Sequence, residues 1–246
     1  MTGPAWLILP TYNEAESLEA HVRAVHAVLG RAEPEGFRIL VVDDNSPDGT
    51  GALADRLAAE LEPVCVLHRA GKQGLGRAYV AGFAQALEAG AGHVLEMDSD
   101  GSHDPADLAR LLAATRAGAD VALGSRYVPG GRVRDWSLGR RLISRGGCWY
   151  ARRVLGVGVR DLTGGLKCFR AAALRALEPE TVSSQGYAFQ VELTYRALRR
   201  GLRVQELPIT FRDRRAGTSK MSGRIALEAV WLVPALRLRA ERAAGA

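Results

Sequence analysis

Two aspartates separated by one residue directly follow a short apolar run in the middle of the chain. The run covers residues 94–97, and Asp98 and Asp100 come next. If the extended geometry of a strand persists, both carboxylates point to the same side. Two converging oxygen ligands suit Mg²⁺ or Mn²⁺ bound jointly with a phosphate-bearing substrate. The spacing therefore favours a divalent metal site at this position.

Two other kinds of site share parts of this sequence pattern. A calcium-binding loop would need Gly and Glu where His103 and Ala109 stand, so it is excluded. A phosphatase of the haloacid-dehalogenase type also carries Asp-x-Asp-Gly-Ser after a strand, but it needs a further acidic cluster downstream. Only nine acidic residues follow Arg126, and none of them are adjacent. A nucleotide-sugar diphosphate bridged by a metal is the third interpretation.

The elements around the aspartates alternate between strand and helix. Short apolar runs predict strands at residues 5–9, 38–42, 64–67, 94–97 and 121–123. Helical spacing of apolar residues predicts helices at 14–29, 50–61, 76–89 and 108–117, and later a helix at 185–200, a strand at 203–209 and a helix at 223–239 broken near Pro234. This alternation predicts an α/β fold with a mostly parallel sheet covered on both faces.

Polar clusters follow all five predicted strands of the first half. Ligands of parallel sheets bind at the carboxyl ends of the strands, so we expect these clusters to share one rim. One aspartate after a strand is ordinary turn chemistry, but two acidic clusters on the same rim exceed it. The clusters occupy residues 10–14, 43–49, 71–76, 98–103 and 124–127.

Charge divides the 246 residues into two unlike halves. The formal net charge is +6, but residues 1–125 carry −9 and residues 126–246 carry +15. An acidic half suits metal ions, and a basic half suits phosphate, anionic lipid or nucleic acid. Two solvated faces of opposite sign explain the division about as well.

Composition restricts the class of protein. Apolar residues make up 47% and charged residues 24%, as in soluble globular proteins. A spanning helix needs about 20 consecutive apolar residues, and the sequence offers no such segment and no secretory signal. Cys65, Cys148 and Cys168 lie far apart, so a disulfide framework or zinc site is not expected and a reducing cytoplasm fits best.

Residues 126–160 interleave aromatic and aliphatic residues with arginines. Trp136, Leu142 and Trp149 are examples of the first kind, and Arg141 and Arg145 of the second. This pattern predicts one or two basic amphipathic helices. Such a helix can cover a core with its apolar side, or it can lie on an anionic membrane, and the residues alone favour the two equally.

Taken in order, the motifs resemble the family-2 glycosyltransferases of the GT-A fold. Within that family, the later segments look like the dolichol- or polyprenol-phosphate mannosyltransferase branch. The likeness extends to about residue 222, with Ser102 standing where the family often has Gln or Ser. The segments that carry it are 9–14, 41–50, 74–76, 97–105, 124–127, 143–146, 161–165 and 214–220.

The resemblance implies transfer of mannose from GDP-mannose to a polyprenyl or dolichyl phosphate with inversion, giving polyprenyl-phosphate mannose and GDP. The same fold using UDP-glucose is the nearest alternative. Asp98, Asp100 and Ser102 would hold Mg²⁺ or Mn²⁺, with Asp98 also near the nucleotide sugar. The matched positions of the nucleotide-sugar site are Pro10, Tyr12, Glu14, Asp43, Asp44 and Gly74.

The resemblance also assigns the acceptor side. Arg126, Arg140 and Ser144 match the positions that hold the lipid phosphate, and Arg214 and Lys220 match a basic loop that closes over both substrates. Arginine suits this work because its planar fork pairs with phosphate oxygens. The expected catalytic group is Asp100, Arg126, Arg140, Arg214 and Lys220.

The resemblance predicts one catalytic domain, followed by a tail. The domain covers residues 1–222, with a nucleotide-sugar and metal half (1–125) and an acceptor half (126–222), and the C-terminal amphipathic helix and tail cover 223–246. We expect peripheral contact with the cytoplasmic face of a membrane, with a membrane-anchoring partner protein as one option. Nucleic acid is not an expected partner, because the aromatics follow helical stripes and the acidic strand ends would be unexplained.

Overall fold

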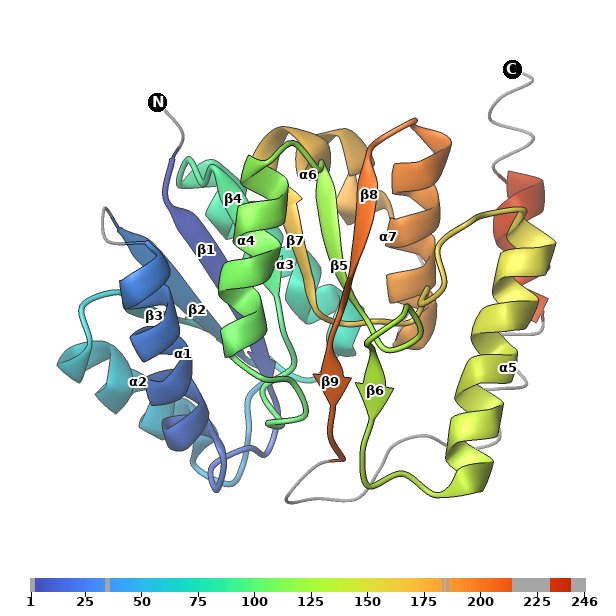
Figure 1. The fold of residues 1–246 in the computed structure, drawn as a ribbon. Coiled ribbons are helices and arrows are strands. Elements are labelled where there is room, and N and C mark those ends of the chain that lie inside the picture. Colours follow the sequence, from blue (N-terminus) through green and yellow to red (C-terminus); the bar gives the residue numbers. More distant parts are fainter. Residues whose placement is uncertain (1–2, 34–35, 183, 185, 214–230, 240–246) are drawn as a thin grey trace.

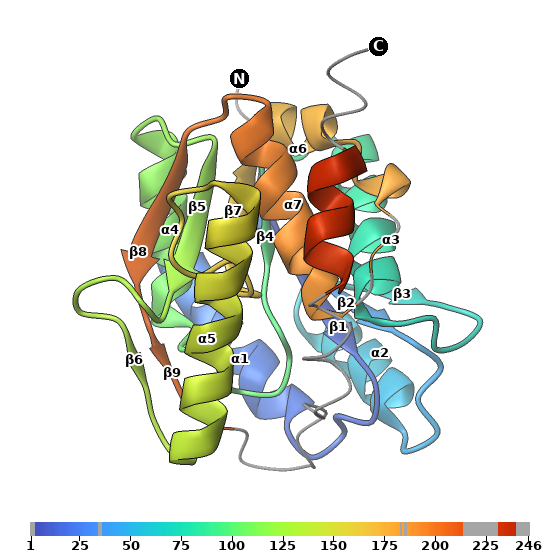
Figure 2. The same cartoon turned by 90° about the vertical axis from the view of Figure 1, so that its right-hand side faces the viewer.

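A mixed seven-stranded sheet forms the centre of the molecule, with helices on both faces (Figures 1 and 2). The computed structural model describes residues 3–33, 36–182, 184, 186–213 and 231–239. The strand order is β3-β2-β1-β4-β7-β5-β8, and β6 and β9 form a separate pair. The strands are β1 (Ala5–Thr11), β2 (Phe37–Asp43), β3 (Val64–His68), β4 (His93–Glu96), β5 (Val121–Ser125), β6 (Arg132–Val133), β7 (Lys167–Arg170), β8 (Val204–Pro208) and β9 (Thr210–Phe211).

Most helices fall close to their predicted positions, but the helical turns within residues 171–181 were not predicted. Those of the first half connect successive parallel strands, as the alternating pattern predicted. The helices are α1 (Leu18–Ala32), α2 (Thr50–Glu60), α3 (Leu75–Glu88), α4 (Ala106–Arg116), α5 (Leu138–Leu155), α6 (Ala171–Leu177), the 3₁₀ turn η1 (Pro179–Thr181) and α7 (Tyr187–Arg199). Residues 231–239 are also helical.

Strand β7 was not predicted, and it changes the sheet. It lies between β4 and β5 and runs antiparallel to both, with Leu95 opposite Cys168 and Ala122 opposite Cys168. The sequence pattern obscured it, because Lys167 puts a charged residue at its first position. The two predicted halves of the chain therefore share one sheet.

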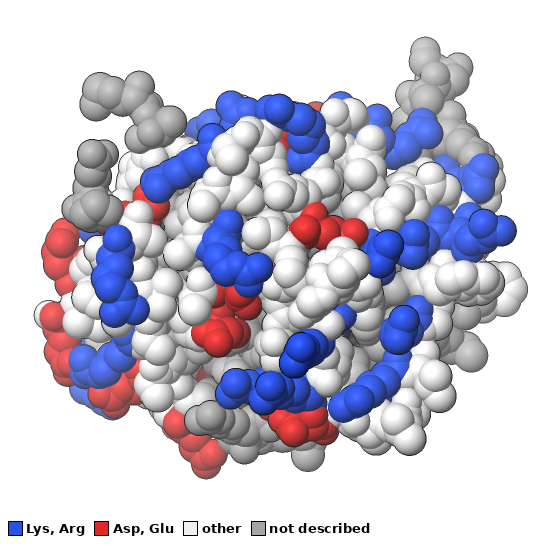
Figure 3. Space-filling model, in the orientation of Figure 1, with Lys and Arg blue, Asp and Glu red and all other residues white. Residues whose placement is uncertain are grey.

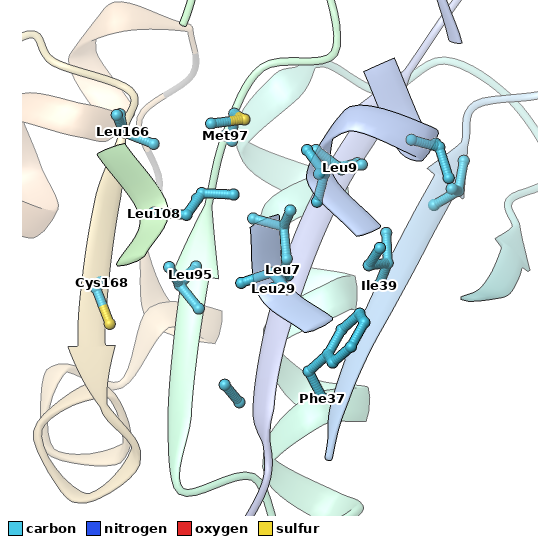
Figure 4. Packing of buried hydrophobic residues seen from close by; sticks show 14 of the residues in the cluster. Leu7, Leu9, Leu29, Phe37, Ile39, Leu95, Met97, Leu108, Leu166 and Cys168 are labelled. Atoms are coloured by element: carbon cyan, nitrogen blue, oxygen red, sulfur yellow. The ribbon is translucent and has the colours of Figure 1, made fainter. Parts of the chain in front are cut away.

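Successive side chains along each strand point to opposite faces of the sheet and contribute to two apolar layers. In β1, Leu7 and Leu9 pack on the side of α1, α2 and α4, whereas Trp6 and Ile8 pack on the side of α3, α6 and α7. Figure 4 shows the first of these layers, in which Leu7, Leu9 and Leu29 lie together. Two-sided burial explains why the strands read as continuous apolar runs.

Helix α5 packs on the body through its C-terminal half. Ala151 and Leu155 join a third apolar cluster with Val191 and Tyr195 of α7 and with Val233 of the helical segment 231–239. Figure 1 shows α5 standing apart from the sheet, and its N-terminal end borders a hollow that β6 also lines. The first half of α5 is therefore left with an open side.

The carboxyl ends of the parallel strands meet at the lower edge of the sheet in Figure 1. Two loops at this edge contain an asparagine in the left-handed region, Asn13 with φ 58° and Asn45 with φ 59°. Asparagine tolerates this conformation better than most residues. Gly74, with φ 97°, allows the turn that starts α3. These turns place the polar clusters on one rim, as predicted.

Candidate active site

A cavity of about 470 Å³ opens at this rim. Strand-end loops of both halves of the chain line it, together with α5, α7 and β9. Asp43, Ser102 and Ser144 do not line it, and Arg214 and Lys220 lie outside the described residues. The predicted site residues that do line it are Pro10, Tyr12, Glu14, Asp44, Gly74, Asp98, Asp100, Arg126 and Arg140.

Asp98 and Asp100, with Glu14 and Asp44, form what we call the acidic wall of the cavity. The Tyr79 hydroxyl donates to Asp98 Oδ1 at 3.0 Å, and the Ser102 amide donates to Asp100 Oδ1 at 3.0 Å. Ser99, which also lines the cavity, donates from Oγ to the Pro10 carbonyl at 2.8 Å. Both aspartates border the cavity, as the sequence predicted.

Tyr79 stays a neutral donor to this wall. It is fully buried, and burial together with the charge of Asp98 raises the pKa of its hydroxyl well above the ordinary value. A protonated phenol can donate to a carboxylate but cannot compete with it for a cation. Tyr79 therefore fixes the orientation of Asp98 without adding charge.

The donor set of the acidic wall fits Mg²⁺ or Mn²⁺. Among the described residues, no group of three or more His, Cys, Asp or Glu side chains could hold a metal ion alone. Mg²⁺ commonly binds through one or two carboxylates and completes its shell with substrate phosphates and water. Asp98 and Asp100 match that arrangement. Ser102 is buried behind Asp100, and within the described chain its Oγ makes no hydrogen bond, so its role as a ligand stays a prediction.

The loops after β1 and β2 line the part of the cavity where the resemblance predicts the nucleotide sugar. Lys72 lies 3.8 Å from the centre of the Tyr12 ring, and Arg69 pairs with the Asp44 carboxylate. Burial raises the pKa of Asp44, against the opposing effect of Arg69. Asp43 instead accepts a 2.6 Å hydrogen bond from Ser46 Oγ and shapes the turn after β2.

Arg126, Trp136, Arg140 and Phe211 also line the cavity, and we call them the basic wall. The Arg126 guanidinium lies 5.6 Å from the Trp136 ring centre, and that of Arg140 lies 4.1 Å from it. Arg126 also lies 5.5 Å from the Phe211 ring. Arginines stack favourably on aromatic faces. Trp136 therefore holds two predicted phosphate-binding arginines side by side.

Arg126 is buried and held by Asp161. Its Nε donates to Asp161 Oδ2 and its Nη2 to Asp161 Oδ1, both at 2.7 Å, and Nη2 also donates to Thr163 Oγ1 at 2.7 Å. Burial opposes both charges, but each stabilises the other: Asp161 raises the pKa of Arg126, and Arg126 lowers the pKa of Asp161. Asp161 and Thr163 of the motif at 161–165 thus orient an arginine.

Arg140 and Ser144 project from α5 towards the same region. Arg140 Nη1 donates to both carboxylate oxygens of Asp213, at 2.8 and 2.9 Å. The Tyr127 hydroxyl donates to Ser144 Oγ at 2.6 Å. Tyr127 lines a second hollow of about 320 Å³ next to the cavity, and Arg126 borders both. The structure therefore brings Ser144 near Arg126 but outside the cavity itself.

His103 is a cavity residue that sequence reasoning did not assign. It is buried, and its ring meets Phe211 edge-on at 5.1 Å. Burial lowers its pKa to about 4, although Asp100 opposes the shift, so the imidazole is neutral near pH 7. Its place just after the two aspartates was the available signal. Gln190 of α7 also lines the cavity.

Helix α5 exposes apolar side chains between arginines. Leu138 is 77% exposed, Leu142 72% and Trp149 63%. Arg141 and Arg145 lie on the same helix and border the second hollow. In Figure 3, basic side chains predominate on the side of α5, and acidic ones gather around α1 and α2. In the part of the chain that is described, no helix is long and apolar enough to cross a membrane.

Comparison with known proteins adds sequence evidence. Residues 6–178 match the family model described as "Glycosyl transferase family 2". The chain is 50% identical over 242 residues to a polyprenol monophosphomannose synthase of Mycolicibacterium smegmatis, covering 97% of this chain and 89% of the relative. It is 51% identical over 226 residues to an undecaprenyl-phosphate mannosyltransferase of Micrococcus luteus, covering 91% and 89%.

A solved structure supports the fold. Glucosyl-3-phosphoglycerate synthase from Mycobacterium tuberculosis, crystallised with Mn²⁺, UDP-glucose and phosphoglyceric acid, superposes with a TM-score of 0.71 at 18% identity. The alignment covers 96% of this chain and 80% of that protein. A likeness at this identity confirms the predicted GT-A-like α/β architecture.

Proposed function

The chain belongs to glycosyl transferase family 2, and from that premise we propose that it transfers mannose from GDP-mannose to a polyprenyl phosphate. The products are polyprenyl-phosphate mannose and GDP. The observation that carries the proposal is the pair of unlike walls in one cavity. Asp98 and Asp100 share the cavity with a pair of arginines stacked on Trp136, so a donor diphosphate and an acceptor phosphate each have matching side chains.

The acidic wall serves the donor. Asp98 and Asp100 would hold Mg²⁺ or Mn²⁺ together with the diphosphate, and the cation would offset the charge that develops on departing GDP. Tyr79 keeps Asp98 oriented, and the Ser102 amide keeps Asp100 oriented. Tyr12, Glu14 and Asp44 would contact the nucleotide, at the end of the cavity where they lie.

The basic wall serves the acceptor. A lipid phosphate is already largely dianionic near neutral pH, because its second pKa is about 6. One of its oxygens forms a bond to carbon 1 of mannose as the bond from that carbon to the diphosphate oxygen breaks, with inversion at carbon 1. No proton has to move, so a general base is not needed. The wall must only hold the phosphate in line, and Arg126 and Arg140 are fixed for that purpose.

His103 fits this division because it is neutral. It follows Asp100 by three residues in the sequence and contacts Phe211 of the basic wall. A neutral imidazole between the walls neither repels the metal nor neutralises the acceptor phosphate. Arg214 and Lys220 remain predicted members of a closing loop.

The exposed side of α5 serves the lipid. Leu138, Leu142 and Trp149 offer apolar contact, and Arg141 and Arg145 offer positive charge to anionic headgroups. The acceptor's phosphate would enter the cavity while its chain stays in the bilayer. We therefore propose peripheral binding at the cytoplasmic face of the membrane, with or without an anchoring partner protein.

The decisive experiment measures transfer of radiolabelled sugar to polyprenyl phosphate, scored by extraction into organic solvent. With Mn²⁺, we expect label from GDP-mannose in the organic phase and little from UDP-glucose. Label from UDP-glucose at an equal rate would contradict the donor assignment. Transfer that is unaffected by chelation of divalent cations would contradict the role of the acidic wall.

A further inference from the structure

A buried polar cluster lies behind the cavity, and no step above uses it. Lys167 of β7 donates from Nζ to Glu96 Oε1 of β4 at 2.8 Å and to the Gly164 carbonyl at 2.7 Å. A third hydrogen bond goes to Gln190 Oε1 of α7. Lys167 and Glu96 are both 0% exposed. An ion pair this deep is weak evidence for stability alone, which raises the question of what it positions.

Lys167 determines which way the Gln190 amide faces. An ammonium group can only donate, so Gln190 must present its oxygen to Lys167. The amide nitrogen of Gln190 therefore points away from Lys167. Gln190 is 2% exposed and lines the cavity, and Nε2 makes no hydrogen bond within the described chain. An amide nitrogen has two hydrogens, so one is left for the cavity even where Glu96 accepts the other.

The surroundings of Gly165 show that Gln190 Nε2 borders the cavity. A Cβ atom added to Gly165 would lie 3.7 Å from Gln190 Nε2 and 3.4 Å from Asp98 Oδ2. Both atoms therefore border the small space above this glycine, which itself lines the cavity. The amide supplies a donor there, and the Asp98 charge disfavours an anion. A neutral hydroxyl group is the ligand that suits this space.

We propose that Gln190 is a specificity-determining residue that donates from Nε2 to a hydroxyl of the donor sugar, and that Lys167 is the positioning residue that orients its amide. The inference rests on the proposed function for the identity of the donor. Glu192, two residues along α7, does not share this role. Its carboxylate accepts hydrogen bonds from Ser184 Oγ at 2.5 Å and from Arg196 Nη2 at 2.6 Å.

The first test compares binding of GDP and GDP-mannose, by calorimetry with Mn²⁺. Gln190→Met keeps the length of the side chain and removes the donor. We expect it to weaken GDP-mannose binding roughly 10- to 100-fold, the effect of losing a buried hydrogen bond, while GDP binding changes less than about twofold. Thr194→Val is the matched control, because it removes a buried hydroxyl that donates to the Gln190 carbonyl of the same helix at 2.9 Å. It should leave the ratio of the two affinities unchanged.

The second test identifies the hydroxyl. Deoxy analogues of GDP-mannose, each lacking one hydroxyl, are compared in wild-type and Gln190→Met protein. One analogue should bind the wild type more weakly than GDP-mannose does, whereas Gln190→Met should bind that analogue and GDP-mannose about equally. This is the behaviour of coupled partners in a double-mutant cycle. Gly165→Ala adds a methyl group with only ordinary contacts, so it should fold normally and weaken GDP-mannose but not GDP.

Lys167→Met tests the positioning role. We expect Lys167→Met to lower the affinity for GDP-mannose relative to GDP by about as much as Gln190→Met does. The double variant should lower this ratio little further. Should Lys167→Met fail to fold, the Gln190 and Gly165 variants still decide the assignment of Gln190. Equal weakening of GDP and GDP-mannose by Gln190→Met, or no weakening of either, would overturn the inference. A wild-type protein that prefers UDP-glucose would instead refute the proposed donor, and the same comparison with UDP and UDP-glucose would then test Gln190.

Discussion

The residues of the acidic wall all follow the ends of parallel strands, whereas the basic wall combines a strand-end residue with residues of α5, of the segment before it and of β9. Asp98 and Asp100 continue directly from β4, so the strand itself aims them. Arg126 follows β5, Arg140 lies on α5 and Phe211 on β9, and pairing with Asp161 and Asp213 holds the two arginines. Anionic ligands for a metal can thus be positioned by backbone geometry. Cations for a mobile lipid phosphate need partners of their own.

Removing one carboxylate of the acidic wall should have the largest effect. We expect Asp100→Ala to reduce mannose transfer at least about 1000-fold, because loss of a group that stabilises transition-state charge typically lowers rates 100- to 1000-fold and metal binding is lost as well. Initial rates with saturating Mn²⁺ measure this. Turnover close to that of the wild type would contradict the assignment of the metal and the donor diphosphate to the acidic wall.

The Arg126–Asp161 pair tests how the basic wall is held. Arg126→Ala leaves Asp161 buried and unpaired, so we expect the free energy of unfolding to fall by about 3–5 kcal/mol, measured by urea denaturation. Use of the lipid acceptor should fall far more than donor binding. The double variant Arg126→Met with Asp161→Asn removes both charges and should recover most of the stability but not the acceptor use. Recovery of both would show that the pair is purely structural.

His103, at the junction of the walls, predicts how stability depends on pH. Burial lowers its pKa from 6.5 to about 4, so between these values the unfolded chain binds a proton that the folded chain does not. Stability should therefore rise with pH across this window and fall on acidification. Its share from pH 7 to pH 5 is about 2 kcal/mol. His103→Gln should flatten the dependence by that amount in urea denaturation, and an unchanged slope would contradict a buried neutral imidazole.

The exposed side of α5 should give the smallest effect, and one confined to the acceptor side. We expect Leu142→Gln to weaken binding to vesicles containing anionic lipid about tenfold, because a buried leucine contributes about 1.5–3 kcal/mol. Sedimentation with vesicles measures this. Transfer to a short, water-soluble acceptor should be unchanged. Equal loss with both acceptors would place Leu142 in the site rather than at the membrane.

The sequence predicted the acidic wall better than the basic wall for a physical reason. Asp98, Asp100 and Asp44 follow apolar strands, and the rim of a parallel sheet collects such residues. Asp161 had no predicted role of its own, because no local pattern indicates that it pairs with Arg126, 35 residues earlier. Gln190 lies on a helix whose register, not composition, turns it to the cavity. Likewise, β7 begins with the buried Lys167, whose partner Glu96 lies 71 residues away.

The place of β7 also has a consequence for biosynthesis. β4 and β5 are consecutive in the chain, but Lys167–Arg170 must enter between them before the sheet is continuous. During translation, the edge of β4 therefore stays unpaired until some 70 further residues have been synthesised. An unpaired strand edge can form hydrogen bonds with other nascent chains. We expect a chain that stops at residue 125 to aggregate rather than to persist as an autonomous donor-binding unit.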